Sequence, residues 1–309
     1  VTGPDGARRL HGDPAALLGA GGPLPERVDW RERGVVTPVK DQGRCGSCWS
    51  FAAAQGLESH AALATGRLEE LSEQQILDCT PNPDECGGQG GCRGAIVQLA
   101  YDKVNALGGL SGEWAYPYRS YQGEDEKCAF EASLLDLRSS FRGNVSTVEL
   151  PSNAYEPLMR AVATFGPVPV SVDASTWHDY QGGVWDGCDQ QSPQLNHAVL
   201  LVGYGSDPVD GDYWLVKNSW GSGWGEGGYI RVRRSADEGA RCGTDTVPGQ
   251  GTGCKGGPAS IKVCGTCGIL YDSAWPLVEP AAAARREAPE GSQPRLRGQK
   301  HPDLPVAEY

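Results

Sequence analysis

The sequence predicts an α+β fold of two lobes, a helical lobe and an antiparallel, barrel-like β lobe. Up to about residue 136 the apolar side chains recur at helical spacing, whereas from residue 137 the apolar runs are short and strand-like. Helices followed by strands are typical of α+β proteins, because each set packs in its own layer. We expect the functional site in the cleft between the lobes, where ligand sites commonly form.

The helical lobe is expected to span residues 34 to about 136 and to be mostly helical. Glycines end two of its predicted helices, and a capping box that begins at Ser72 opens another. The three predicted helices are 48–66, 72–79 and about 94–108.

The β lobe is expected to span residues 137–278, together with a strand within residues 24–33. It begins with one helix that has Pro157 in its first turn, and its predicted strands are 168–172, 198–204, 212–217 and 228–233. The flanking stretches 1–23 and 279–309 have too few large apolar side chains to fold alone. We interpret the first as a linker or the tail of a pro-segment, and the second as a disordered C-terminal tail.

Composition excludes some partners and indicates a compartment. A formal charge of -12 argues against nucleic acid and anionic membranes as partners, and no run of 18 apolar residues could span a bilayer. Eleven cysteines, an odd number, leave at least one without an intramolecular disulfide partner, and cysteines in a chain of this size indicate an oxidising, secretory environment. The sequence begins at Val1 and shows no signal peptide, so we expect an upstream segment to be missing.

Cys48 is the candidate nucleophile. It begins a predicted helix, where the positive end of the helix dipole favours the thiolate over the thiol. The run Cys45-Gly46-Ser47-Cys48-Trp49 matches the pattern C-G-[SA]-C-[WY]. On these residues the segment resembles the active-site helix of the papain family of cysteine proteases. The opposing interpretation is that Cys48 is a buried structural thiol or half of a disulfide.

His197 is the candidate acid and base. It opens a predicted strand and follows Cys48 by 149 positions, within the separation of roughly 130–150 residues that is typical of this family. The other histidines fall in less suitable places: His11 and His301 in the tails, His60 on the nucleophile helix itself, and His178 in a polar run that we interpret as a solvated loop.

Two further residues complete the resemblance. Asn218, in the run Lys217-Asn218-Ser219-Trp220-Gly221, would hold the His197 ring in one orientation, and Trp220 would shield that contact from water. Gln42, six residues before Cys48, resembles the amide of the family's oxyanion hole. The resemblance covers residues 24–278 as one peptidase domain, and it is closest to the cathepsin L and papain branch.

This resemblance implies a two-lobed papain-like fold and a cysteine endopeptidase that forms a thioester on Cys48, with no cofactor and no metal. It also implies a substrate-binding surface, in which Asp272 forms the floor of the main specificity pocket and could pair with Arg or Lys; the other residues of this surface are Gly94, Ile96, Val97, Ser171, Asn196 and Trp220.

The resemblance implies three disulfides, Cys45–Cys92, Cys79–Cys128 and Cys188–Cys267. It leaves Cys86, Cys242, Cys254 and Cys264 unassigned, because an insertion of about 25 residues from Cys242 to Cys264 departs from the family pattern and four cysteines allow three pairings. A rival interpretation is a zinc site made of Cys242, Cys254, Cys264 and Cys267.

Two other functions stay open: an exopeptidase in which the 242–264 insertion blocks one end of the cleft, and an inactive papain-like binding or storage protein. The expected partners are peptide and protein substrates, protein inhibitors and the protein's own pro-segment, and we expect a monomer in the lysosome, vacuole or extracellular space. Asn144 is a candidate glycosylation site, since Asn144-Val145-Ser146 matches N-x-[ST].

Overall fold

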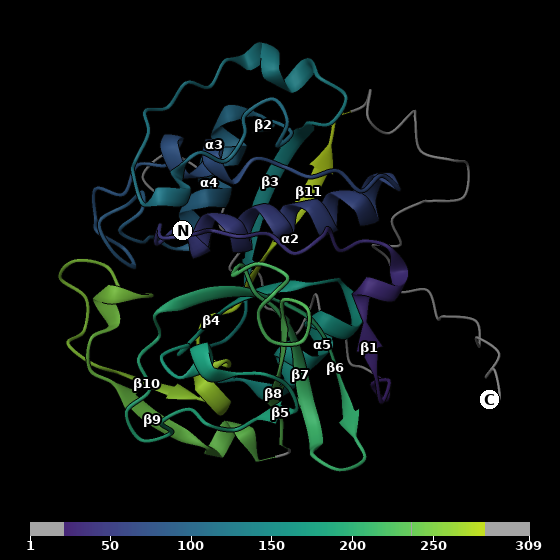
Figure 1. Cartoon of the computed structure of the whole chain (residues 1–309), viewed down its shortest axis with the longest axis vertical. Helices are drawn as coiled ribbons and strands as arrows, with labels where there is room; N and C mark the ends of the chain where they lie inside the picture. Colours follow the sequence, from purple (N-terminus) through teal and green to yellow (C-terminus); the bar gives the residue numbers. More distant parts are fainter. Residues whose placement is uncertain (1–21, 236, 282–309) are drawn as a thin grey trace.

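The computed structural model describes residues 22–235 and 237–281, in which two lobes lie one above the other (Figure 1). Most of the two predicted tails, 1–23 and 279–309, lies outside the described residues. Within the described residues no helix is long and apolar enough to cross a membrane. The expected α+β architecture of two lobes is confirmed.

The helical lobe holds the three expected helices: α2 (Cys48–Thr65), α3 (Glu73–Cys79) and α4 (Val97–Leu107). Gly66 ends α2 in the left-handed conformation, with φ 75°, and its N–H donates to the Ala62 carbonyl. The Ser72 hydroxyl accepts a hydrogen bond from the Gln75 N–H and so caps α3. Local capping chemistry therefore sets these boundaries.

The lobe is less helical than expected. α4 begins at Val97 rather than near Gly94, because Gly94 has φ +87 and Ile96 is extended. Between α4 and residue 140 the chain forms only the two-residue strand β2 (Gly109–Leu110) and two short 3-10 helices, η2 (Ser120–Gln122) and η3 (Ala132–Asp136). Turns and the Cys79–Cys128 disulfide, rather than regular helices, therefore fix the path of the backbone in this region.

The β lobe is built on one six-stranded sheet with the order β1-β6-β7-β8-β5, in which β4 also pairs with β6. Its pairs are antiparallel except β5 with β8, which is parallel. The helix α5 (Tyr155–Thr164) packs against it. The strands are β1 (Val28–Asp29), β4 (Val168–Val172), β5 (Val184–Trp185), β6 (His197–Asp207), β7 (Gly211–Lys217) and β8 (Tyr229–Arg233). Short 3-10 helices follow β1 and β4: η1 (Trp30–Arg33) and η4 (Trp177–Asp179).

A second sheet belongs to both lobes, which differs from the expected boundary at residue 137. β3 (Phe141–Glu149) pairs through its first two residues with β2 of the helical lobe and through residues 143–149 with β11 (Ala274–Pro280). β3 packs against α4, and β11 packs against α2 (Figure 1). β11 also extends to Pro280, so the C-terminal tail begins later than residue 279.

The insertion forms a two-stranded hairpin, β9 (Cys242–Asp245) and β10 (Ile261–Cys264), with 3-10 helices η5 (Glu238–Ala240), η6 (Pro248–Gln250) and η7 (Thr266–Gly268) around it. Residues 246–260, which we call the strap, leave this hairpin and reach the helical lobe (Figure 1).

The described cysteines form five disulfides, and Cys48 is the free one among them. The three pairs implied by the resemblance are present, and the unassigned cysteines pair as Cys86–Cys254 and Cys242–Cys264. All four cysteines of the rival zinc site are therefore half-cystines and have no thiolate for a metal, so that interpretation is wrong.

A buried charge cluster lies under α2. The Lys40 ammonium contacts the carboxylates of Glu58 and Glu73, whose side chains are 0% and 1% exposed. Glu58 also accepts hydrogen bonds from the Leu71 N–H and the Thr37 hydroxyl. Burial lowers the pKa of Lys40, but the two carboxylates outweigh it and raise this pKa above its ordinary value.

Candidate active site

Cys48 is the first residue of α2, at the boundary between the lobes. Ser47 precedes the helix without capping it, since its hydroxyl bonds to the Tyr118 hydroxyl at 2.8 Å. The first N–H groups of α2 therefore stay available to a negative charge near Cys48. Burial raises the pKa of the Cys48 thiol, while the backbone N–H groups of Ala198, Trp49 and Cys48 itself lower it.

His197 is the first residue of β6 and pairs with Val172 of β4. Its Nε2 lies 2.7 Å from Oδ1 of Asn218, which directly follows β7. We assign the proton of this hydrogen bond to Nε2, because an amide oxygen only accepts. Nδ1 is then the basic nitrogen, and both His197 and Cys48 line one pocket.

Aromatic rings surround the imidazole. The Trp220 ring lies 5.0 Å from the His197 ring, and the Trp177 ring meets it edge-on at 6.3 Å. This burial lowers the pKa of His197 to about 4, against the effect of the Asn218 hydrogen bond, which raises it. Burial therefore opposes a charge on either group taken alone, whereas the first N–H groups of α2 favour a negative charge at Cys48.

Gln42 is placed beside the nucleophile by three hydrogen bonds. Its Nε2 donates to the Cys45 carbonyl at 2.8 Å, its Oε1 accepts from the Ser219 hydroxyl at 2.7 Å, and its N–H donates to the Ser219 carbonyl. The amide is thereby fixed in one orientation, and one N–H of its NH₂ group is left for a ligand. Such a preorganised donor is what an oxyanion site requires.

The pocket at Cys48 and His197 has a volume of about 180 Å³. Five residues of the predicted substrate-binding surface line it: Gly94, Ile96, Val97, Ser171 and Asn196. Asp272 lies behind this lining, where its carboxylate accepts hydrogen bonds from the Ser171 hydroxyl at 2.6 Å and the Gln98 amide at 2.9 Å. Trp220 covers His197 instead of lining the pocket.

The site also contains residues that the sequence did not predict. The same pocket is lined by Gly87, Leu195, Ala198 and, from the strap, Gln250 and Gly251. His178, expected in a solvated loop, is exposed but stacks on the Trp220 ring at 4.7 Å. The pairing of Cys86 with Cys254 is what brings the strap here, and spacing alone does not reveal it.

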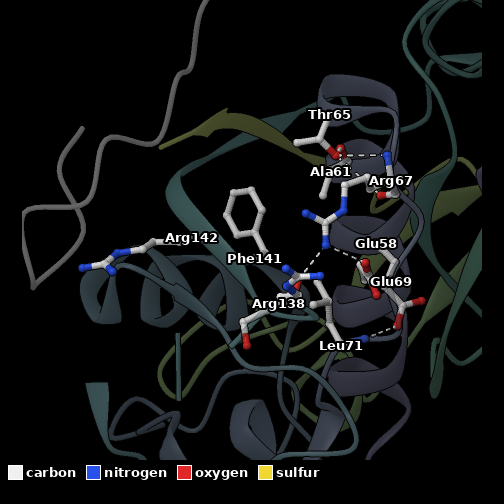
Figure 2. A pocket seen from close by; sticks show the side chains of 10 residues that line it. Glu58, Ala61, Thr65, Arg67, Glu69, Leu71, Arg138, Phe141 and Arg142 are labelled. Carbon is white, nitrogen blue, oxygen red and sulfur yellow. Dashed lines mark hydrogen bonds and ion pairs between the residues drawn. The ribbon is translucent and has the colours of Figure 1, made fainter. Parts of the chain in front are cut away.

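A second pocket lies on the helical lobe, away from Cys48 and His197, and has a volume of about 50 Å³ (Figure 2). Arg67 donates across it to Glu69 at 2.8 Å and to the Arg138 carbonyl at 2.7 Å. Glu58 reaches its wall from α2 but belongs to the buried cluster described above. This pocket therefore borders the structural core and has no catalytic candidate in its lining.

Comparisons with known proteins agree with this geometry. The family described as "Papain family cysteine protease" matches residues 24–252. A "Cathepsin L-like" protein of Caenorhabditis elegans is 41% identical over 250 residues, which cover 78% of this chain and 70% of that protein. "Procathepsin L" of Mus musculus is 41% identical over 244 residues, or 77% of this chain and 67% of that protein.

Solved structures show the same fold. Bromelain from Ananas comosus, in complex with the E64 inhibitor, superposes with a TM-score of 0.64 at 34% identity, covering 83% of this chain and all (100%) of that one. Digestive procathepsin L 3 of Tenebrio molitor gives a TM-score of 0.63 at 36% identity and covers 83% of this chain and 71% of that one. The chain belongs to the papain family of cysteine proteases.

Proposed function

We propose that Cys48 is the nucleophile and His197 the general acid and base of this cysteine endopeptidase. The observation that carries the proposal is the hydrogen bond from Nε2 of His197 to Asn218, which leaves Nδ1 for the only free thiol among the described residues. Transfer of the thiol proton to Nδ1 creates two opposite charges that stabilise each other. The same proton is then available for the leaving group.

The reaction is an acyl transfer in two halves. The Cys48 sulfur attacks the scissile carbonyl carbon, and the His197 imidazolium protonates the departing amine. Neutral His197 then takes a proton from water, which attacks the thioester and releases the carboxylic acid product. The Gln42 amide and the Cys48 N–H donate to the oxyanion in both halves, and losing one such donor typically lowers kcat by about 10²–10³.

A thiol-labelling experiment tests the nucleophile assignment. Native, non-reduced enzyme treated with iodoacetamide should take up one label, on Cys48, because the other described cysteines are in disulfides. Hydrolysis of a fluorogenic peptide should fall in proportion to labelling. Full labelling of Cys48 with retained activity would contradict the proposal, and so would activity that is lost before Cys48 reacts.

We propose that the specificity pocket accepts both apolar and basic side chains. Apolar walls, Ile96 and Val97, favour aliphatic or aromatic side chains, while the Asp272 carboxylate behind Ser171 would pair with an incoming Arg. The carboxylate already accepts from two neutral donors, which hold it in place.

We expect Asp272→Asn to lower the Arg/Phe ratio of kcat/KM by about tenfold, since a hydrogen bond between charged groups is worth about 1.5–3 kcal/mol. The measurement compares two peptides that differ only in Arg or Phe at the second position before the scissile bond. Asp186→Asn, which removes a carboxylate in a half-exposed ion pair with Arg233, is the control and should leave the ratio unchanged. A ratio that is equal in wild type and Asp272→Asn would eliminate the assignment.

The cellular setting follows from the same features. Five disulfides support residence in the secretory pathway, and we propose the lysosome, the vacuole or the extracellular space as the final location. Its substrates are proteins and peptides. As finer proposals, the enzyme is a monomer, is blocked by protein inhibitors and by its own pro-segment, and carries a glycan on the exposed Asn144 of β3.

A further inference from the structure

The strap crosses the substrate pocket from one lobe to the other. Its residues Gln250 and Gly251 line the same pocket as Cys48 and His197. At its base, Cys242 is bonded to Cys264, and Cys267 next to that base is bonded to Cys188. The strap therefore starts from a firmly crosslinked part of the β lobe.

Gly251 contacts both walls of the cleft at once. A Cβ added to Gly251 would lie 1.6 Å from the Leu195 carbonyl oxygen of the β lobe. A Cβ added to Gly87, on the helical lobe, would lie 2.6 Å from the Gly251 carbonyl oxygen. Neighbouring extended backbones need about 4.7–4.9 Å between them, so no second polypeptide can pass between the walls at this point.

The far end of the strap is fixed to the helical lobe. Cys254 is bonded to Cys86, the Gly87 N–H donates to the Gly253 carbonyl at 2.8 Å, and the Lys255 N–H donates to the Asp84 carbonyl at 2.8 Å. The Lys255 ammonium also pairs with Glu85 at 2.9 Å. If the strap left this position, these backbone hydrogen bonds would break and the Cys86–Cys254 disulfide would be strained.

We propose that the strap closes the acyl side of the cleft just beyond the specificity pocket, so that it sets how far a substrate can extend before the scissile bond. The inference rests on the proposed function, because the pocket lined by Ile96, Val97 and Ser171 receives the residue two positions before that bond. Substrates with two residues on this side fit under the strap. Longer polypeptides are cleaved only when the strap moves off the walls, and they are therefore cleaved more slowly.

Two fluorogenic peptides test this directly. Both carry the same leaving group and the same two residues before the scissile bond, and one has about six further residues on the acyl side. In wild type, kcat/KM for the extended peptide should be at least about tenfold lower than for the short one, because the strap must give up its backbone hydrogen bonds. In the double variant Cys86→Ser/Cys254→Ser, the extended/short ratio should rise by about tenfold or more.

A matched glycine pair gives the same test without removing a disulfide. Gly251→Ala places a methyl group against the Leu195 carbonyl and pushes the strap off the wall, so the extended/short ratio should rise. Gly249→Ala, in the same strap but with no atom within 4 Å of its added Cβ, should leave both peptides at wild-type rates.

Equal kcat/KM for the two peptides in wild type, unchanged by either strap variant, would overturn the inference. Failure of wild type to cleave either peptide, in a protein whose thermal unfolding is intact, would contradict the proposed function itself, and the strap inference would fall with it.

Discussion

Replacing Cys48 or His197 with alanine should abolish peptide hydrolysis, lowering kcat/KM by at least about 10⁴-fold, while the protein stays folded. The sulfur forms the bond to the substrate, and the imidazole moves both protons of the reaction. Because the two act as one unit, the double variant should be no slower than either single variant. The measurement is kcat/KM on the short fluorogenic peptide, with the unfolding temperature as the check on structure.

Asn218→Ala should lower kcat/KM less than Cys48→Ala does. It removes the hydrogen bond that orients the His197 ring but no reacting atom, so the loss should be smaller than for Cys48→Ala. Residual activity of Cys48→Ala above roughly 10⁻⁴ of wild type would mean that another group attacks the carbonyl. An Asn218→Ala variant as inactive as Cys48→Ala would mean that Asn218 does more than position the ring.

Replacing Lys40 with methionine should lower the free energy of unfolding by roughly 3–5 kcal/mol, the usual cost of leaving a buried charge without its partner. Lys40 is the cation that contacts both Glu58 and Glu73, whose carboxylates are shielded from solvent. Methionine keeps the apolar stem of the side chain and removes the charge. Urea unfolding, compared at a common pH, gives the difference.

The matched control is Arg142→Met on the surface. Arg142 pairs with Asp136, and both side chains are more than half exposed (59% and 66%), so the expected loss is below about 1 kcal/mol. Equal losses in the two variants would show that burial of the Lys40 cluster carries no special cost. Because Glu58 lies on α2, partial unfolding of Lys40→Met should also reduce activity by displacing Cys48.

The sequence predicts correctly those features of the structure that depend on residues close together in the chain. The helix at Cys48, its end at Gly66 and the Ser72 cap depend on neighbours within a few positions, so the sequence was enough to place them. The pairing of His197 with Asn218 joins two distant segments, and it was reached through the resemblance, not through spacing alone.

The features that the sequence does not predict depend on contacts between residues far apart in the chain. Four unassigned cysteines allow three pairings, and only the three-dimensional path of the strap selects Cys86–Cys254. Burial, which raises the pKa of the Cys48 thiol, also depends on the whole fold, whereas the helix dipole that favours its thiolate is a local property. Likewise, nothing local to the sequence near Asp272 reveals that Gln98 donates to its carboxylate.

The sheet shared by the two lobes has a consequence during translation. α2 carries Cys48 early in the chain, yet it packs against β11, residues Ala274–Pro280, which the ribosome makes much later. β11 in turn pairs along β3, so neither lobe has its complete packing until that strand arrives. Until β11 has been made, a nascent chain therefore carries its nucleophile helix on an incompletely packed scaffold.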